Sequence, residues 1–122
     1  MKHSPAFLAL VNDSKSRVKE LTVEEVAEKI NRGDKFFFID TREDSEWEAG
    51  HASGAIHLGK GIIERDIENA IPDPNAEIIL YCGGGFRSAL AADSLQKMGY
   101  KNVISMDGGM RRWRELGLPE ET

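Results

Sequence analysis

The sequence has few of the features that crosslink a chain or anchor it in a membrane. Its 122 residues include one cysteine, which excludes an internal disulfide and argues against a disulfide-stapled secreted scaffold. No apolar run approaches the roughly 20 residues that span a bilayer. The apolar segment 6–11 is short, and no small-residue cleavage pattern follows it, so it differs from a signal peptide. We therefore expect a cytoplasmic protein without a membrane partner.

Excess basic charge and metal ligands are also scarce. The formal net charge of −5 disfavours nucleic acid as a partner, because nucleic-acid sites are usually basic. His51 and His57 have no cysteine or carboxylate at ligand spacing, so we expect no metal, and His51 is interpreted as a hydrogen-bonding residue in its turn. There is no repeat or low-complexity tract. The 40% of apolar residues suits an ordinary globular domain.

Short apolar segments alternate with helical patterns along the chain. Runs rich in β-branched and aromatic residues have the near-continuous apolarity of strands covered on both faces: 36–40, 77–82 and 102–106, with a weaker candidate at 55–58. Helical patterns lie between them at 61–71 and 88–98. Another helix is predicted after Thr22, which forms a capping-box pattern with Glu25. The alternation predicts an α/β fold with a parallel sheet.

The N-terminal segment has the pattern of a separate helix. Ser4 and Pro5 are typical of a helix start, so we expect a helix over residues 5–18. This helix belongs to a predicted extension, residues 1–19, ahead of a domain at 20–122. Its apolar side chains cover either this domain or a second copy of the chain, which leaves monomer and homodimer both open: Phe7, Leu8, Leu10 and Val11.

The only cysteine, Cys82, lies at a predicted strand-to-helix turn with the sequence CGGGFRS. Glycines in such a turn allow positive φ and let the backbone approach a bound group closely. Successive amides there can form an anion-binding nest, and the helix start adds unpaired N–H groups. Together with the positive charge of Arg87, these groups favour a thiolate, the nucleophilic form of cysteine. A buried structural cysteine is the alternative.

Two charged residues follow the first predicted strand and reach the same edge of the sheet as Cys82. Ligands of open α/β sheets gather beyond the carboxyl ends of the strands. Arg42 either binds a donor anion or forms a structural ion pair with Asp40. Asp40 in turn orients Arg87 or the loop, or serves only in that pair. Arg87 either faces the anion or pairs with a carboxylate that shapes the turn.

Three segments resemble the rhodanese-like sulfurtransferases. CGGGFRS matches the Cys-x-x-Gly-x-Arg-Ser loop of single-domain members, with Gly85 as the inner glycine. DTREDSEWEAGHASGAIHL at 40–58 and NVISMDGGMRRW at 102–113 resemble the first and last signatures of that family. The resemblance implies an α/β domain with a small, mostly parallel sheet of about five strands and helices on both faces.

The resemblance also implies a function for the loop. Cys82 would carry a persulfide and move sulfane sulfur from thiosulfate, a persulfide or a polysulfide to a thiol or cyanide, without metal or cofactor. The loop residues would bind the substrate: Gly83, Gly84, Gly85, Phe86, Arg87 and Ser88. Some relatives place a basic or polar side chain where this sequence has two glycines. The bare loop therefore favours a persulfide, a polysulfide or a protein partner over thiosulfate.

Two other functions compete with a sulfurtransferase. A rhodanese module can instead act as a persulfide carrier or sensor, or as a non-catalytic module that binds a partner protein. A cysteine phosphatase or arsenate reductase also holds a thiolate in an anion cradle that ends in arginine. Related phosphatases have five residues between these two, whereas four separate Cys82 from Arg87. An arsenate reductase normally uses a second thiol, which this sequence lacks.

Overall fold

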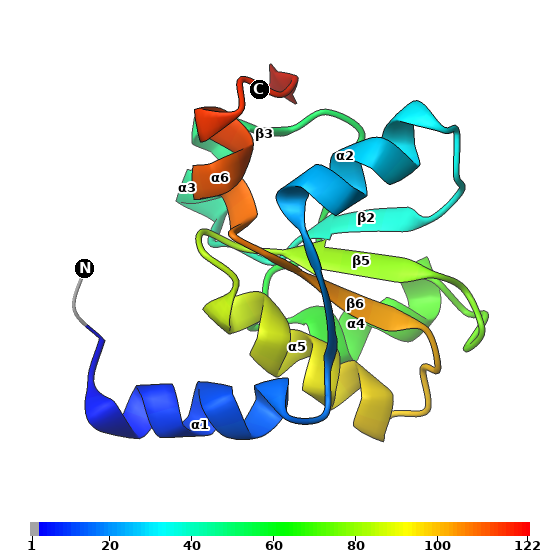
Figure 1. Cartoon of the computed structure of the whole chain (residues 1–122). Coiled ribbons are helices and arrows are strands. Elements are labelled where there is room, and N and C mark those ends of the chain that lie inside the picture. The colour runs from blue at the N-terminus through cyan, green and yellow to red at the C-terminus, as the bar shows by residue number, and fades with distance from the viewer. Residues whose placement is uncertain (1–2) are drawn as a thin grey trace.

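A parallel β-sheet forms the centre of the molecule, between layers of helices (Figure 1). The computed structural model describes residues 3–122. Neighbouring strands are all parallel, in the order β1-β6-β5-β2-β4. The strands are β1 (Lys19–Thr22), β2 (Phe37–Asp40), β4 (Ile56–His57), β5 (Ile78–Tyr81) and β6 (Val103–Asp107). A separate antiparallel pair consists of β3 (His51–Ala52) and β7 (Glu120–Glu121). The predicted α/β class and five-stranded sheet are confirmed.

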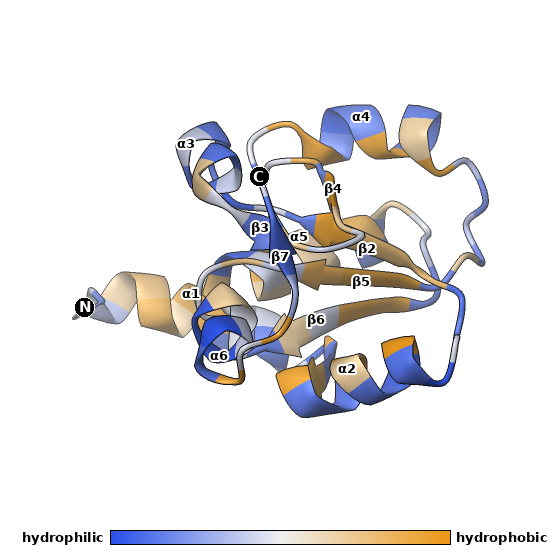
Figure 2. Ribbon diagram, turned by 90° about the horizontal axis from the view of Figure 1, so that it is seen from above, coloured by the Kyte–Doolittle hydropathy of each residue, from blue (hydrophilic) through white to orange (hydrophobic). Residues whose placement is uncertain are grey.

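Helices cover both faces of the sheet, as predicted. They are α1 (Pro5–Lys15), α2 (Val23–Asn31), α3 (Asp44–Ala49), α4 (Ile63–Ala70), α5 (Phe86–Lys97) and α6 (Gly109–Glu115). Helices α4 and α5 share a hydrophobic core with one face, and α2 and α6 share a second core with the other. In Figure 2 the apolar strands β2 and β5 lie between α4 and α2.

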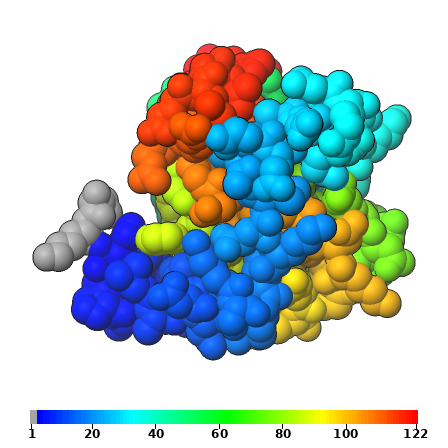
Figure 3. Space-filling model, viewed as in Figure 1, coloured from blue at the N-terminus to red at the C-terminus, as the bar shows by residue number. Residues whose placement is uncertain are grey.

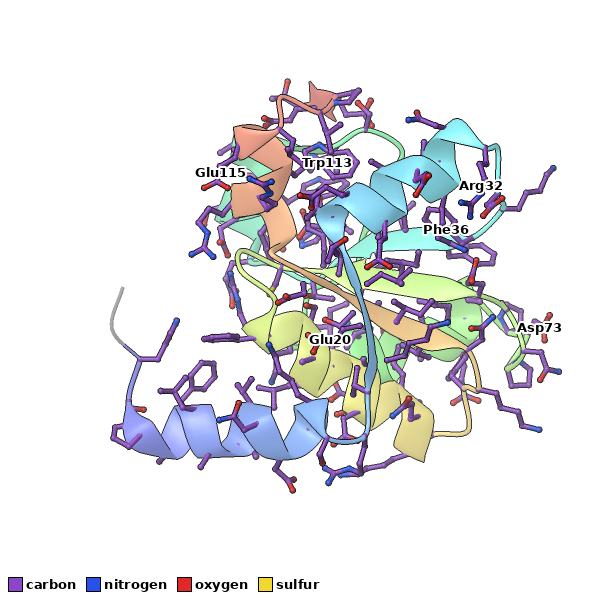
Figure 4. The ribbon with its side chains drawn as sticks, in the orientation of Figure 1. Glu20, Arg32, Phe36, Asp73, Trp113 and Glu115 are labelled. Carbon is purple, nitrogen blue, oxygen red and sulfur yellow. The ribbon has the colours of Figure 1, made fainter. Side chains whose placement is uncertain are left out.

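The central strand β5 shows how one short segment serves both cores. Ile78 and Leu80 belong to the core under α4 and α5, whereas Ile79 and Tyr81 belong to the core under α2 and α6. All four are fully buried. A strand buried on both faces has no polar alternation, which explains the continuous apolar run in the sequence. Figure 4 shows Trp113 pointing from α6 towards α2, where it closes the second core.

The edge strand β1 has no counterpart in the sequence prediction. Its four residues pair with β6 in register, but all of them are exposed or half-buried. A polar edge strand lacks the apolar run by which the other strands were predicted. The helix after it begins as expected, because Thr22 accepts from the Glu25 amide at 3.1 Å and Glu25 accepts from the Thr22 amide at 2.9 Å.

Helix α1 lies against α5, on the outer side of the sheet's lower helical layer in Figure 1. The helix ends at Lys15, three residues before the predicted end, and Ser4 caps its start as expected. Val11 and Ser14 are buried, whereas Leu10 exposes 55% of its surface. Polar contacts add to this burial: Arg17, just beyond α1, donates to Asp93 of α5 at 2.7 and 3.1 Å. Ser14 donates to the same carboxylate at 3.2 Å.

Candidate active site

The loop that contains Cys82 joins the end of β5 to the start of α5. Tyr81 ends the strand, and α5 begins at Phe86, two residues earlier than the sequence suggested. Gly85 precedes the helix with a φ of +109°, a conformation that glycine adopts at little cost. The turn is therefore tight enough to place the first amides of α5 directly beside the cysteine.

The sulfur atom of Cys82 is surrounded by hydrogen-bond donors of this loop. The Gly85 amide donates to Sγ at 3.1 Å and the Ser88 amide at 3.4 Å. The Cys82 thiol donates to the Ser88 hydroxyl at 3.5 Å, and this hydroxyl shares a 2.8 Å hydrogen bond with the hydroxyl of Ser105 on β6. Only 1% of Cys82 is exposed. These donors supply positive electrostatic potential where a thiolate or a persulfide would carry its charge.

The orientation of the loop amides is fixed by the first turn of α6. The Met110 amide donates to the Cys82 carbonyl at 2.8 Å, and the Arg111 amide donates to the Gly83 carbonyl at 3.0 Å. The Gly108 amide also donates to the Gly84 carbonyl at 3.3 Å. With its carbonyl oxygens turned towards α6, the loop is free to present amides to the sulfur. Helix α6 thus shapes the site without contacting Sγ through any of these bonds.

Two glycines let the loop and α6 come this close together. A Cβ on Gly109 would overlap the Cys82 carbonyl oxygen and lie 2.7 Å from the Gly83 carbonyl carbon. A Cβ on Gly85 would lie 3.1 Å from the Asp107 carboxylate. The sequence Asp-Gly-Gly at 107–109, expected only to be a turn into the last helix, is therefore part of the loop's support.

Arg87 forms the charged wall of the site with a carboxylate from α3. Its guanidinium donates to both oxygens of Glu46, at 2.8 and 3.1 Å. Hydrogen bonding to Glu46 is the main reason that the pKa of Arg87 is raised, and the nearby Cys82 raises it further. Arg87 therefore keeps its positive charge beside the sulfur. This geometry agrees with the alternative in which Arg87 pairs with a carboxylate that shapes the turn. The carboxylate is that of Glu46, and Asp40 does not bind Arg87.

Asp40 and Arg42 form a buried ion pair of their own. The Arg42 guanidinium donates to both Asp40 oxygens at 2.9 to 3.1 Å and to the Gly50 carbonyl at 2.7 Å. The Tyr81 hydroxyl donates to Asp40 at 2.7 Å. Burial opposes the charge on Arg42, but Asp40 outweighs it and raises the pKa of the guanidinium. Neither Asp40 nor Arg42 is among the residues that line the pocket. This geometry agrees with the alternative in which Asp40 and Arg42 form a structural ion pair, rather than the one in which Arg42 binds a donor anion.

Cys82 is among the residues that line a pocket of about 710 Å³. Its lining comes from four parts of the chain: His3 and Phe7 near the start, Glu46, the loop residues Cys82, Gly84, Phe86 and Arg87, and Asp107, Gly108 and Arg111. In Figure 3 the yellow-green loop lies in a recess between the blue N-terminal segment and the orange start of α6. The pocket is thus far larger than a single sulfur atom needs.

Several residues that contribute to this site carry no signal in the local sequence. Glu46 and Ser105 are ordinary polar residues whose partners lie 41 and 17 residues away, so no local spacing marks them. Arg111 was contained in the last family signature without being singled out. Phe7 was expected to pack on the domain or on a second copy, and it lies at the mouth of the pocket.

His51 and His57 do not line this pocket but stack around Trp47. The ring of His51 is parallel to that indole at 3.4 Å between centroids, and His57 lies on it at 5.0 Å. The Nδ1 atom of His51 lies 3.0 Å from the Trp47 carbonyl oxygen, which confirms the predicted hydrogen bond in the turn.

Within residues 3–122, no cluster of three His, Cys, Asp or Glu side chains could hold a metal ion. None of the helices described there is long and apolar enough to cross a membrane.

Known proteins resemble the part of the chain that contains the Cys82 loop. A sequence model of the rhodanese-like domain matches residues 22–116. YtwF of Bacillus subtilis, provisionally named a sulfurtransferase, is 32% identical over 103 residues, which are 84% of this chain and 97% of that protein. YrkF of the same organism, provisionally named a sulfur carrier protein, is 31% identical over 84% of this chain. The chain spans only 54% of the length of YrkF.

Solved structures share the fold over nearly the whole chain. A Rhodopseudomonas palustris protein of unknown function, described as a possible tyrosine phosphatase, superposes with a TM-score of 0.86 at 29% identity, over 99% of this chain and 98% of that chain. The polysulfide-sulfur transferase homodimer of Wolinella succinogenes superposes with a TM-score of 0.77 at 25% identity. That match covers 95% of this chain and 87% of the other.

Proposed function

Because the chain belongs to the rhodanese-like domain family, we propose that it is a sulfurtransferase that carries sulfane sulfur as a persulfide on Cys82. The observation that supports this most is the environment of Sγ. It lies beside a 710 Å³ pocket and accepts hydrogen bonds from the amides of Gly85 and Ser88. A structural cysteine needs neither the pocket nor the converging amides.

In the first half-reaction, the Cys82 thiolate attacks the outer sulfur of a donor R–S–SH. A bond forms between Sγ and that sulfur, the S–S bond of the donor breaks, and its electron pair leaves on RS⁻. The product is Cys82–S–SH. With thiosulfate as donor, the leaving group is sulfite. The loop amides offset the negative charge on the sulfur atoms throughout, and the fixed charge of Arg87 adds to their effect.

In the second half-reaction, an acceptor thiolate attacks the outer sulfur of Cys82–S–SH. The new S–S bond forms on the acceptor, and the electron pair of the broken bond returns to Sγ as thiolate. With cyanide, the products are thiocyanate and a proton. A single nucleophile therefore serves both half-reactions in a ping-pong scheme. Cys82 is the only cysteine, so the acceptor comes from outside this chain.

The bare loop favours persulfides or polysulfides as donors. A Cβ on Gly84 would meet nothing within 4 Å, so no side chain of the loop occupies this part of the pocket, and a side chain that could bind the sulfonate of thiosulfate is missing at this position. The names of similar proteins, a sulfur carrier and a polysulfide-sulfur transferase, agree with a donor of this kind.

We assign catalysis to the domain from residue 20 onwards and expect it to operate in a reducing compartment such as the cytoplasm, where the thiol stays free.

Phosphoryl transfer is the second candidate, because one structural neighbour is described as a possible tyrosine phosphatase. A tetrahedral phosphoryl group needs a wide ring of inward amides and a free arginine. Here only four residues separate Cys82 from Arg87. The Arg87 guanidinium is not free, because two of its nitrogens donate to the two carboxylate oxygens of Glu46. This geometry favours sulfur over a phosphoryl group.

The test is mass spectrometry of the purified protein combined with a turnover assay. Incubation with glutathione persulfide or inorganic polysulfide is expected to add the mass of one sulfur atom at Cys82, and added cyanide is expected to remove it as thiocyanate. The Cys82→Ser protein is the matched control and gains no labile sulfur. Assays with p-nitrophenyl phosphate run in parallel.

Each outcome identifies one function. Repeated turnover supports the enzyme. A mass gain that transfers to no small acceptor supports a persulfide carrier. Cys82-dependent release of phosphate without any persulfide supports the phosphatase, and an unchanged mass gain in Cys82→Ser refutes the assignment of the nucleophile.

A further inference from the structure

The N-terminal helix supplies a wall of the active-site pocket although it lies outside the segment that matches the family. The family match begins at residue 22, whereas α1 ends at Lys15. His3 and Phe7, at the start of this segment, line the same pocket as Cys82. The core of the domain therefore provides the nucleophile, and the extension provides part of the space in front of it.

This wall is aromatic. The His3 and Phe86 rings meet edge to face with centroids 4.9 Å apart, and Phe7 lies 5.3 Å from His3 and 6.2 Å from Phe86. Phe86 is the first residue of α5 and follows the Cys82 loop directly. Phe7 and Phe86 are both half-buried, so part of each ring remains free for a ligand. Such faces favour an apolar or aromatic group over a small inorganic ion.

The aromatic wall is held to the loop by α1. Lys15, in the last turn of α1, lies 5.1 Å from the centre of the Phe86 ring and 3.8 Å from the Asp107 carboxylate. Beside Lys15, Arg17 and Ser14 bind the Asp93 carboxylate of α5. These contacts hold the C-terminal end of α1 against the domain, and the contact between the Phe7 and Phe86 rings joins the start of α1 to the loop.

The lining of the pocket also includes an arginine of α6, Arg111. The carboxylate of Glu46 is bound to Arg87, and that of Asp107 lies near Lys15. On α6, Arg112 pairs with Glu24 and Arg114 with Glu120, but no carboxylate of residues 3–122 lies within ion-pair distance of Arg111. Arg111 lines the pocket and is exposed. Its guanidinium is therefore available to an anionic group of the ligand.

We propose that α1 is a specificity-determining wall, and that the substrate is an organic persulfide, or its thiol, with an apolar body and a distant carboxylate. The body packs on Phe7 and Phe86, the carboxylate meets Arg111, and the sulfur reaches Cys82. The inference rests on the proposed function, because it uses the same sulfur transfer. Since R–S–SH and R–SH exchange the sulfur reversibly, one pocket serves the donor in one direction and the acceptor in the other.

The test compares acceptors of Cys82-bound sulfur. 4-(Mercaptomethyl)benzoate carries the ring and the carboxylate, benzyl mercaptan carries only the ring, and cyanide carries neither. In Phe7→Ala, the kcat/KM for 4-(mercaptomethyl)benzoate divided by that for cyanide is expected to fall about fivefold to tenfold. In Arg111→Gln, the preference for the carboxylate thiol over benzyl mercaptan is expected to fall about fivefold. Leu10→Ala, on the exposed side of α1, is the matched control and keeps both ratios.

A binding measurement separates this inference from the proposed function. Calorimetry follows the unreactive thioether 4-(methylsulfanylmethyl)benzoate on the Cys82→Ser protein, with and without Phe7→Ala or Arg111→Gln. Weaker binding in both variants supports the pocket even where no turnover is measured. Sulfur transfer to cyanide with unchanged ratios and unchanged thioether binding overturns the inference and leaves the proposed function standing. Absence of any persulfide at Cys82 refutes the proposed function instead.

Discussion

The guanidinium of Arg87 and the carboxylate of Glu46 face each other in a two-bond ion pair, with distances of 2.8 and 3.1 Å. Arg87 follows the Cys82 loop on α5, and Glu46 comes from α3, 41 residues earlier. Glu46 also accepts from the Glu43 amide at 3.0 Å, so its position is fixed from its own helix. The pair holds a positive charge beside the sulfur in one orientation.

Replacement of Glu46 by glutamine is expected to lower sulfur transfer without unfolding the protein. Glutamine retains an oxygen for the Glu43 amide, but it loses the charge that orients Arg87. We expect kcat/KM to fall on the order of tenfold, because a misdirected charge stabilises the persulfide less well. Glu48→Gln, an exposed change on the same helix, is the control. Partial recovery in Glu46→Asp would indicate positioning, and full activity in Glu46→Gln would contradict this role.

The same pair predicts how stability depends on pH. Hydrogen bonding to Arg87 lowers the pKa of Glu46 from 4.5 to about 2. Because the folded pKa lies below the unfolded one, the carboxylate contributes stability above pH 4.5, and this contribution is lost as the pH falls towards 2. The difference in unfolding free energy between the unmodified protein and Glu46→Gln should therefore be constant from pH 5 to 8 and shrink below. Chemical denaturation across this range measures it, and a difference that grows in acid would contradict the prediction.

The Ser88 hydroxyl is expected to contribute to persulfide formation. It accepts from the Cys82 thiol at 3.5 Å and shares a 2.8 Å hydrogen bond with the Ser105 hydroxyl. Once the sulfur is ionised, the Ser88 hydroxyl can accept from Ser105 and donate to the thiolate. A hydrogen bond to a charged group contributes about 1.5–3 kcal/mol, so Ser88→Ala should slow persulfide formation on the order of tenfold or more. Stopped-flow measurement with polysulfide tests this. Ser105→Ala leaves the Ser88 hydroxyl in place, and its effect on the rate should be smaller.

The contact between α6 and the loop predicts that Gly109 tolerates no side chain. Alanine there would place Cβ against the carbonyls of Cys82 and Gly83 at a φ of +53°. We expect Gly109→Ala to destabilise the fold by about 2–4 kcal/mol and to lower the melting temperature, since the clash and the positive φ add. Gly84→Ala is the control for stability, because its Cβ would meet nothing within 4 Å. Equal melting temperatures for the two variants would contradict the predicted contact.

The attachment of α1 should weaken in acid through Asp93. Hydrogen bonding to Arg17 lowers the pKa of this carboxyl from 3.8 to about 2. Its contribution is complete above pH 3.8 and is lost as the pH falls towards 2. At pH 7 we expect Asp93→Asn to cost about 1–2 kcal/mol and to increase hydrogen exchange in α1. Asp66→Asn, which removes a surface pair with Arg65, should leave exchange in α1 unchanged.

The local sequence determined much of the fold and the centre of the site. Buried strands such as 77–82 show continuous apolar runs because both faces are covered, and the capping pair Thr22 and Glu25 lies within one helical turn. The Cys82 loop was identifiable because its glycines, arginine and serine are neighbours in the chain. Each of these features depends on residues a few positions apart, so their spacing alone predicts them.

Only the tertiary structure decided which distant groups meet Cys82. It paired Arg87 with Glu46 and kept Arg42 in a separate buried pair with Asp40, although both arginines follow strand ends. It turned the Gly83 carbonyl towards α6 and brought Phe7 from α1 to the mouth of the pocket. Such contacts depend on how helices pack across the sheet, and packing joins residues whose separation in sequence carries no periodic signal. The sequence therefore located the cysteine at the centre of the candidate site, and the packing of α1, α3 and α6 shaped the pocket beside it.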